Sequence, residues 1–209
     1  MNQYDADYYL HGRESGKSLY DNYRWLPDLT IPMVHRMADH LGITTNDTVL
    51  DFGCARGYTV KAFRESLGIE CYGIDVSEWA IANADEKVRE FVSCTDKIPL
   101  GMDWIIAKDV LEHVPQVADA IDAMMEVATK GVFAVVPLSM FDGHPYIVAD
   151  YEKDVTHIHR LCLSSWAKFF MRPGWTVEGA YMVDGVKANY QTWQWGNGFL
   201  TCRRLDTQT

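Results

Sequence analysis

Residues 48–75, TVLDFGCARGYTVKAFRESLGIECYGID, decide the fold of this chain. An apolar run enters a turn that contains Gly53 and Gly57, a helical segment follows, and a second apolar run ends at Asp75. A strand, a loop, a helix and a strand in this order form the β-α-β unit of a parallel sheet. Open α/β sheets bind ligands at the carboxyl ends of their strands, so Asp51 and Asp75 are expected beside a ligand.

The turn after the first strand predicts a nucleoside-containing ligand. Gly53 and Gly57 let the backbone approach a ligand without a Cβ in the way, and Gly57 stands where the loop becomes the helix. The N–H groups at a helix N-terminus attract a carboxylate or a phosphate. Asp75 follows Asp51 by 24 residues (75 − 51) and ends the next strand. A carboxylate there accepts hydrogen bonds from both hydroxyls of a ribose.

Two common nucleotide-binding loops do not fit these residues. A dinucleotide-binding loop reads G-x-G-x-x-G, and Asp51 stands in place of its first glycine. A carboxylate at that place repels a pyrophosphate, so a cationic ligand fits better and a dehydrogenase is disfavoured. The loop after this first strand also lacks the G-K-[ST] signature of a P-loop.

Three ordered motifs between residues 48 and 115 resemble those of class I S-adenosylmethionine-dependent methyltransferases. D-F-G-C-A-R-G at 51–57 resembles the family's loop D-x-G-C-[GA]-x-G, and G-I-D-V-S at 73–77 resembles its ribose-binding segment. D-W-I-I-A-K-D-V-L-E-H-V-P at 103–115 resembles its fourth strand and exit loop. The resemblance implies S-adenosylmethionine as cofactor. It also implies an α/β fold, a Rossmann-like sheet of seven mostly parallel strands with a terminal antiparallel hairpin and helices on both faces.

The resemblance further implies which residues of the sheet and its loops contact the cofactor. They are Asp51, Gly53, Cys54, Gly57, Asp75, Val76, Thr95, Asp96, Lys108 and Asp109. The match loosens around residues 94–99, where the family has a turn that touches the adenine. Asp96 would bond the exocyclic amine there, with Thr95 or a backbone N–H as alternatives, and a solvated loop acid is the other interpretation of Asp96.

Residues 1–26 carry five tyrosines and Trp25 without a clear period. One interpretation is an N-terminal arm that packs over the core. The other follows the family, in which such segments often close over the cofactor, where aromatic faces attract a sulfonium. The second interpretation adds Tyr20, Tyr23 and Arg24 to the cofactor-binding residues.

Residues 138–163 form a substrate-side insertion after the fifth predicted strand. The run D-V-T-H at 154–157 and the Ser, Trp and Gly-Trp that follow resemble a pattern found in small-molecule and sugar-modifying members of the family. An acceptor that must lose a proton needs a base, and imidazoles titrate near working pH. The candidate catalytic residues are His157, His113 and His144, and histidines that only fix their loops are the alternative for His113 and His157.

A metal site is not predicted. Asp154, His157 and His159 offer oxygen and nitrogen ligands at short spacing. Histidines two residues apart point to opposite faces of an extended chain, however, and methyl transfer needs no metal.

Composition bounds the partners and the compartment. A chain of 209 residues is expected to form a single methyltransferase domain over 1–209, with 1–26 as its arm and 138–163 as its insertion. The net charge of −10 and the absence of a Lys/Arg cluster argue against nucleic acid. Five scattered cysteines favour reduced thiols. No signal segment and no apolar run of ~18 residues is present, so a cytoplasmic location without membrane contact is expected.

These observations predict methyl transfer from S-adenosylmethionine to a small polar acceptor, for which a sugar or glycan is one candidate class. The alternative from another class is a non-catalytic S-adenosylmethionine-binding regulator or assembly protein. The intact loop, ribose acid and exit loop favour the enzyme. The attacked atom and the oligomeric state stay open.

Overall fold

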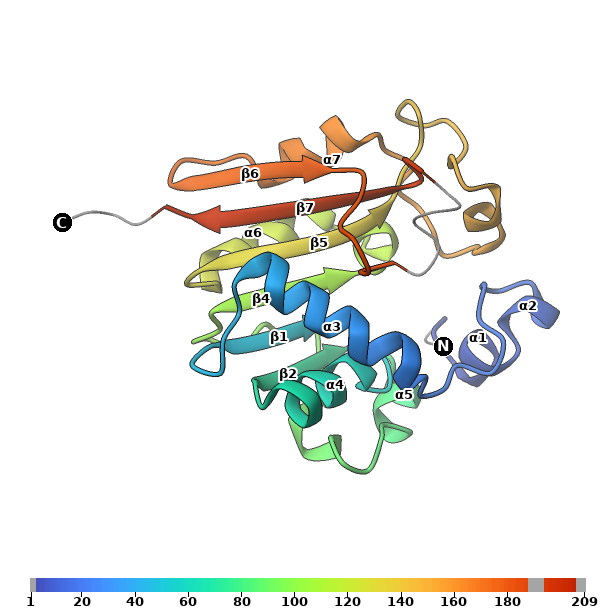
Figure 1. The fold of residues 1–209 in the computed structure, drawn as a ribbon. Helices are drawn as coiled ribbons and strands as arrows, with labels where there is room; N and C mark the ends of the chain where they lie inside the picture. The colour runs from blue at the N-terminus through green and yellow to red at the C-terminus, as the bar shows by residue number, and fades with distance from the viewer. Residues whose placement is uncertain (1–2, 188–193, 206–209) are drawn as a thin grey trace.

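The computed structural model describes residues 3–187 and 194–205, and a mixed sheet runs through its centre (Figure 1). The strand order is β3-β2-β1-β4-β5-β7-β6. The strands of this seven-stranded sheet are β1 (Thr48–Phe52), β2 (Glu70–Asp75), β3 (Val92–Cys94), β4 (Trp104–Lys108), β5 (Gly131–Pro137), β6 (Trp175–Ala180) and β7 (Asn197–Arg204). The predicted Rossmann-like architecture with a terminal antiparallel hairpin is confirmed.

Strand pairing brings the carboxyl ends of the parallel strands to one edge of the sheet. β1 pairs in parallel with β2 and β4, and Asp51 lies opposite Gly73 on β2 and Ile106 on β4. β7 runs antiparallel to both β5 and β6. The arrowheads of β1, β2 and β4 therefore point toward the same side, on the right of Figure 1.

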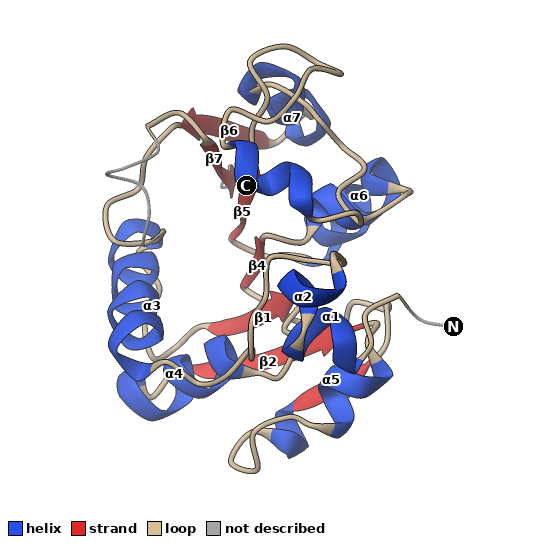
Figure 2. Ribbon diagram, turned by 90° about the vertical axis from the view of Figure 1, so that its right-hand side faces the viewer, coloured by secondary structure: helices blue, strands red, loops and turns tan. Residues whose placement is uncertain are grey.

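Helices cover both faces of the sheet, as Figure 2 shows from the side. α3 (Pro27–Leu41) and α4 (Tyr58–Leu67) lie on one face, and α6 (Val117–Val127) and α7 (Leu163–Phe170) lie on the other. The shorter helices are α1 (Ala6–Leu10), α2 (Gly12–Ser15), α5 (Glu78–Ala82), η1 (Arg89–Phe91), η2 (Leu111–His113) and η3 (Ala149–Lys153). Among the described residues, no helix combines the length and the apolar character that crossing a bilayer requires.

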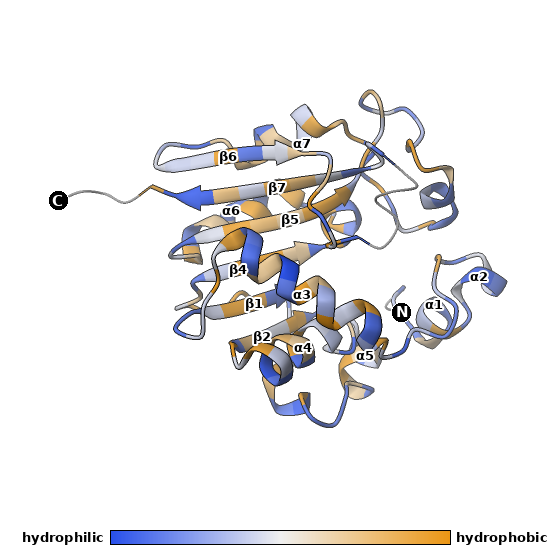
Figure 3. Ribbon diagram, in the orientation of Figure 1, coloured by the Kyte–Doolittle hydropathy of each residue, from blue (hydrophilic) through white to orange (hydrophobic). Residues whose placement is uncertain are grey.

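The apolar runs of the central strands follow from burial on both faces. In β5, Phe133 and Val135 pack into the cluster that contains α3 and α4. Val132 and Ala134 pack into the cluster that contains α6 and α7. Side chains alternate along a strand, so a strand covered on both faces needs apolar residues at every position. Figure 3 shows the apolar colour along the middle of the sheet.

The sequence predicts a helix after β2 that Ser77 caps and that runs to about Arg89, and the helix in the structure is shorter. Ser77 caps it as expected, because its Oγ accepts a hydrogen bond from the N–H of Ala80 at 3.0 Å. The predicted end near Arg89 is wrong, since α5 stops at Ala82. Asp85 redirects the chain there: its carboxylate accepts bonds from the N–H of Lys87 and from Nζ of Lys61, at 3.1 and 2.7 Å.

The N-terminal arm and the insertion after β5 lie against each other beyond the carboxyl edge of the sheet. Tyr8 Oη donates to Asp154 Oδ2 at 2.9 Å, and the N–H of Val155 donates to the carbonyl of Lys17 at 3.3 Å. Ser77 Oγ on the β2 side donates to the carbonyl of Tyr4 at 2.6 Å. These contacts hold the arm over the end of β2, where the ligand site is expected.

Candidate functional site

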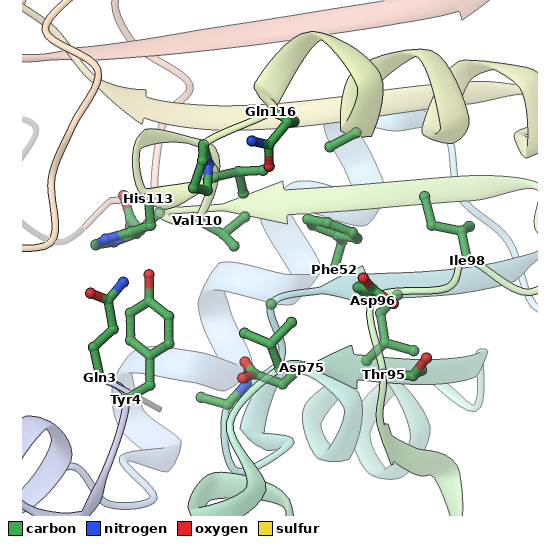
Figure 4. A pocket seen from close by; sticks show the side chains of 18 of the residues that line it. Gln3, Tyr4, Phe52, Asp75, Thr95, Asp96, Ile98, Val110, His113 and Gln116 are labelled. Atoms are coloured by element: carbon green, nitrogen blue, oxygen red, sulfur yellow. Dashed lines mark hydrogen bonds between the residues drawn. The ribbon is translucent and has the colours of Figure 1, made fainter. Parts of the chain in front are cut away.

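A cavity of about 480 Å³ opens at the carboxyl ends of β1, β2 and β4 (Figure 4). Four parts of the chain line it. They are the glycine loop with the end of β2, the loop after β3, the exit loop of β4 with the start of α6, and the N-terminal arm. Cavities of roughly 300–1,000 Å³ at this place in an α/β sheet hold small ligands.

Asp75 occupies the position predicted for a ribose-binding acid. It lines the cavity at the tip of β2 and is 9% exposed. Its Oδ2 accepts the N–H of Ala55 at 2.8 Å, and its Oδ1 accepts the N–H of Ser77 at 2.7 Å. These bonds fix the carboxylate and leave each oxygen a second lone pair. Burial raises the pKa of Asp75 above its usual value.

Gly53 lines the cavity and has no room for a side chain. Its φ is +81°, and an added Cβ would lie 2.4 Å from Cγ2 of Val110 in the exit loop. Both the left-handed backbone and the close approach of the exit loop therefore require glycine.

Replacing Gly53 with alanine is expected to lower the free energy of unfolding by about 2–4 kcal/mol, because backbone strain and the clash with Val110 add. Gly101→Ala is the matched control. Gly101 has a φ of +82° and nothing within 4 Å of an added Cβ, so only the strain of about 1–2 kcal/mol remains. Urea denaturation measures both variants, and equal losses would contradict the close contact.

The residues expected near the adenine lie on the same wall as Asp75. Thr95, Asp96 and Val76 all line the cavity. The N–H of Thr95 donates to the carbonyl of Asp75 at 3.0 Å, which joins the loop after β3 to the tip of β2. Asp96 is exposed, in contrast to the buried Asp75. Figure 4 shows Thr95 and Asp96 next to each other on the loop after β3, on the same side of the cavity as Asp75.

Four predicted cofactor residues lie behind the cavity wall and do not line it: Asp51, Cys54, Gly57 and Lys108. Gly57 caps α4 with a φ of +77°. Lys108 Nζ pairs with Oδ2 of Asp109 at 2.5 Å, and Lys187 Nζ pairs with Oδ1 of the same residue at 2.5 Å. Asp109 itself lines the cavity, and although burial opposes its ionisation, these two lysines lower its pKa.

The N-terminal arm contributes tyrosines to the cavity. Tyr20 lines it as predicted, whereas Tyr23 packs beside it in an aromatic cluster and Arg24 is exposed outside the lining. Tyr8 and Tyr9 also line the cavity, and Tyr9 stacks on Trp79 with ring centroids 5.3 Å apart. Tyr8 and Tyr9 were not predicted as lining residues. The signal available for them was Asp5, a helix-capping residue that begins the helix on which both tyrosines lie.

Only one of the three candidate catalytic histidines reaches the cavity. His113 lines the cavity, and the ring of Tyr4 points toward the His113 ring, with ring centroids 5.9 Å apart (Figure 4). His157 is buried behind His113, with ring centroids 4.6 Å apart. His144 is exposed beside Phe141 and lies outside the lining. Burial and the neighbouring His157 lower the pKa of His113 to about 4, so its imidazole is neutral at pH 7.

A family model described as a methyltransferase domain matches residues 24–178, which is more than half of the chain. The chain belongs to the class I S-adenosylmethionine-dependent methyltransferase family. The cofactor of this family is S-adenosylmethionine, and the residues that line the cavity fit it, because a buried carboxylate at the tip of β2, a glycine loop and aromatic faces meet there.

Individual relatives are distant from this methyltransferase-family chain. Carboxy-S-adenosyl-L-methionine synthase 1 of Yersinia pseudotuberculosis is 31% identical over an alignment 108 positions long, and the match covers 41% of this chain and 44% of the relative. The match thus spans less than half of that relative's length. The plantazolicin methyltransferase BpumL, solved with S-adenosylhomocysteine, superposes with a TM-score of 0.62 at 13% identity, over 85% of this chain and 83% of BpumL. The [4+2]-cyclase SpnF superposes with a TM-score of 0.63 at 15% identity, over 91% of this chain and 86% of SpnF.

Several lining residues of this methyltransferase-family chain were not predicted. Phe52, Ile98 and Val110 supply apolar surface, and Gln116 supplies an amide near His113 (Figure 4). Val110 lies inside the quoted exit loop, and Gln116 directly follows it. Position in or next to a motif was therefore the signal available for these two, and also for Phe52, which lies inside the quoted glycine loop. Ile98 has no distinguishing signal in the sequence.

The buried carboxyl group of Asp51, at the start of the glycine loop, makes the stability of the fold depend on pH. It is 5% exposed, and burial raises its pKa to about 7. The folded state therefore binds a proton more tightly than the unfolded state between pH 4 and pH 7, and the contribution of Asp51 to stability falls as the pH rises through that window.

Replacing Asp51 with asparagine is expected to raise the free energy of unfolding at pH 8 by about 1–4 kcal/mol and to change it little at pH 4. Asp47→Asn is a control for which the opposite change in stability is expected. Asp47 is buried, yet bonds from Lys130 and Thr44 lower its pKa, so its charge stabilises the fold above pH 4. Asp47→Asn should therefore destabilise at pH 8. Thermal unfolding at the two pH values compares the variants, and the same sign for both would contradict the assignment.

Proposed function

We propose that this chain transfers the methyl group of S-adenosylmethionine to a small polar acceptor. The observation that carries the proposal is that one cavity joins Asp75 and the glycine loop to His113. A cofactor with its ribose at Asp75 and an acceptor beside His113 would share a single space, as direct transfer between them requires.

The proposed cofactor position uses the described walls of the cavity. Asp75 accepts the ribose hydroxyls, Thr95 and Asp96 lie along the adenine, and Gly53 leaves space beside the backbone. Tyr8 and Tyr20 also line the cavity, where their aromatic faces would stabilise the positive charge of a sulfonium.

The cofactor supplies an electrophilic methyl group when it is bound. The protein's task is then to hold the acceptor in line with that group, which contributes roughly 7–11 kcal/mol through effective concentration. His113 and Tyr4 close the acceptor end of the cavity with polar and aromatic groups. His157 and Glu112 lie buried beside His113, and burial together with His157 lowers the pKa of His113.

A small polar acceptor fits the surface left beside His113. Gln3, Gln116 and Asp119 line this part of the cavity and offer amide and carboxylate groups for hydrogen bonds. The run at 154–157, similar to that of sugar-modifying methyltransferases, makes a sugar or glycan the first class to test. The net charge of −10 disfavours a polyanionic acceptor.

The proposal is tested by incubating the full chain with S-adenosylmethionine labelled on the methyl group and a fractionated metabolite extract. Transfer of label to a small polar compound is the expected result. SpnF shows that this fold also occurs in a cyclase. Tight binding of the cofactor without transfer to any fraction would therefore overturn the proposal in favour of a non-catalytic or differently reacting binding protein.

A further inference from the structure

A trio of polar side chains lies at the His113 wall of the cavity, with two of the three buried behind the lining. Glu112 and His113 come from η2, and His157 comes from the insertion after β5. The two segments are joined by hydrogen bonds, since the N–H of Ile158 donates to the carbonyl of Glu112 at 2.9 Å. The trio is therefore held by two loops that are bonded to each other.

The three side chains face a common point without bonding one another. Nε2 of His113 lies 4.0 Å from Oε1 of Glu112, and Nε2 of His157 lies 3.9 Å from the same oxygen. One ligand atom from each of the three residues lies within 4.8 Å of the other two. These separations are too long for hydrogen bonds.

The hydrogen bonds around Thr156 determine the tautomer of His113. The Thr156 hydroxyl donates its single proton to Oδ1 of Asp154 at 2.6 Å. The contact of 2.7 Å between that hydroxyl and Nδ1 of His113 must therefore be donated by the imidazole. Neutral His113 consequently carries its lone pair on Nε2, the atom that faces Glu112.

Burial leaves polar atoms of this trio without partners. Glu112 is 1% exposed and His157 is 8% exposed. Within the described residues, Oε2 of Glu112 and Nδ1 of His157 have no hydrogen-bond partner. Nε2 of His113 and Nε2 of His157 face Oε1 of Glu112 across gaps that no hydrogen bond fills, and buried polar atoms without partners destabilise a fold.

We propose that Glu112, His113 and His157 bind a divalent transition-metal cation at the wall of the cavity. Bonds of about 2.0–2.2 Å from imidazole nitrogen and carboxylate oxygen place the ligand atoms of a tetrahedral site about 3.3–3.6 Å apart, so these side chains would rotate slightly toward one another to bind one ion. Two imidazoles and one carboxylate suit zinc, cobalt or manganese and leave coordination positions open. Thr156 and Asp154 orient His113 as outer partners of metal-bound histidines do.

This trio differs from the ligand set considered in the sequence, and it departs from the expectation of no metal. The carboxylate of Asp154 accepts hydrogen bonds from Tyr8 Oη at 2.9 Å, from the N–H of Thr156 at 2.9 Å and from the Thr156 hydroxyl at 2.6 Å. Nε2 of His159 contacts the carbonyl of Val114 at 2.7 Å. Neither residue is therefore a ligand here.

The position of the ion has a consequence that rests on the proposed function. Because His113 lines the cavity, an open coordination position would face an acceptor oxygen and lower the pKa of its proton. The acceptor class would then be one that offers oxygen to a metal, such as a hydroxyl-bearing small molecule.

The test uses the full chain after treatment with a chelator and its removal. Cobalt(II) is titrated while visible absorption is recorded, and zinc(II) and manganese(II) binding is measured by calorimetry. One equivalent of cobalt(II) is expected to bind and to raise the melting temperature. Glu112→Gln and His157→Gln should each weaken cobalt(II) binding at least tenfold. His35→Gln, on α3 and outside the cavity lining, is the matched control and should bind as the wild type does.

A third variant tests the site without removing a ligand, in case Glu112→Gln or His157→Gln fails to fold. Thr156→Val keeps all three ligands and removes the partner of Nδ1, so cobalt(II) binding should weaken about tenfold. Absence of binding of all three metals to the folded wild type would overturn the site. Unchanged binding in both Glu112→Gln and His157→Gln would overturn it as well. Full methyl transfer by a chain that binds no metal would refute this inference alone, whereas metal binding without transfer would support the site and refute the proposed function.

Discussion

Asp75→Ala is expected to weaken the binding of S-adenosylhomocysteine at least 100-fold, measured as Kd by calorimetry. Two ribose hydroxyls would each lose a bond to a charged acceptor, worth about 1.5–3 kcal/mol, and 100-fold corresponds to about 2.7 kcal/mol. The N–H groups of Ala55 and Ser77 would also lose their acceptor, which loosens the glycine loop.

Asp96→Ala is the control for this result. Asp96 lines the same wall but is exposed, so its loss should change Kd by less than about 10-fold. Asp75→Asn keeps the side-chain volume and separates loss of charge from loss of packing. Circular dichroism checks that each variant is folded. A wild-type Kd in folded Asp75→Ala would remove Asp75 from the ribose site.

His113→Ala is expected to lower turnover by about 10²–10⁴-fold, the range for loss of a group that moves or stabilises a proton in the reaction. The Kd of S-adenosylhomocysteine should stay within about 3-fold of the wild type, because His113 and Asp75 lie on different walls of the cavity (Figure 4). Initial rates with a labelled cofactor and calorimetry measure the two quantities separately.

His157→Ala should show the same split with a smaller loss, since His157 lies behind His113 and does not line the cavity. His35→Ala is a control outside the cavity lining and should leave both quantities unchanged. Equal losses of turnover and cofactor affinity in His113→Ala would mean that this residue supports the whole cavity and has no separate role at the acceptor.

Most of the sheet followed from local patterns in the sequence. The run from 48 to 75 contains its own strand, turn, helix and strand, and the apolar runs at β4 and β5 reflect burial on both faces. The length of α5 did not follow, because Asp85 ends the helical path through bonds to Lys61 and Lys87, of which Lys61 lies on another helix. A sequence window does not contain that partner.

The candidate site divides in the same way. Asp75 and Gly53 were predictable, because their roles depend on a turn and a strand end that the motif encodes. The contact between His113 and His157 was not predictable, since it joins residues on two loops far apart in the sequence. The tautomer of His113 depends on a hydrogen bond to Thr156, which only the fold brings within reach. The tyrosines of the arm showed no period that would distinguish the lining residues from the packing residues.

A crystal structure of the chain with S-adenosylhomocysteine would test directly whether the cofactor lies between Asp75 and His113. We expect both ribose hydroxyls within hydrogen-bond distance of the Asp75 carboxylate and the sulfur on the side of the cavity that faces His113. A ligand that leaves Asp75 free, or whose sulfur points away from His113, would contradict it.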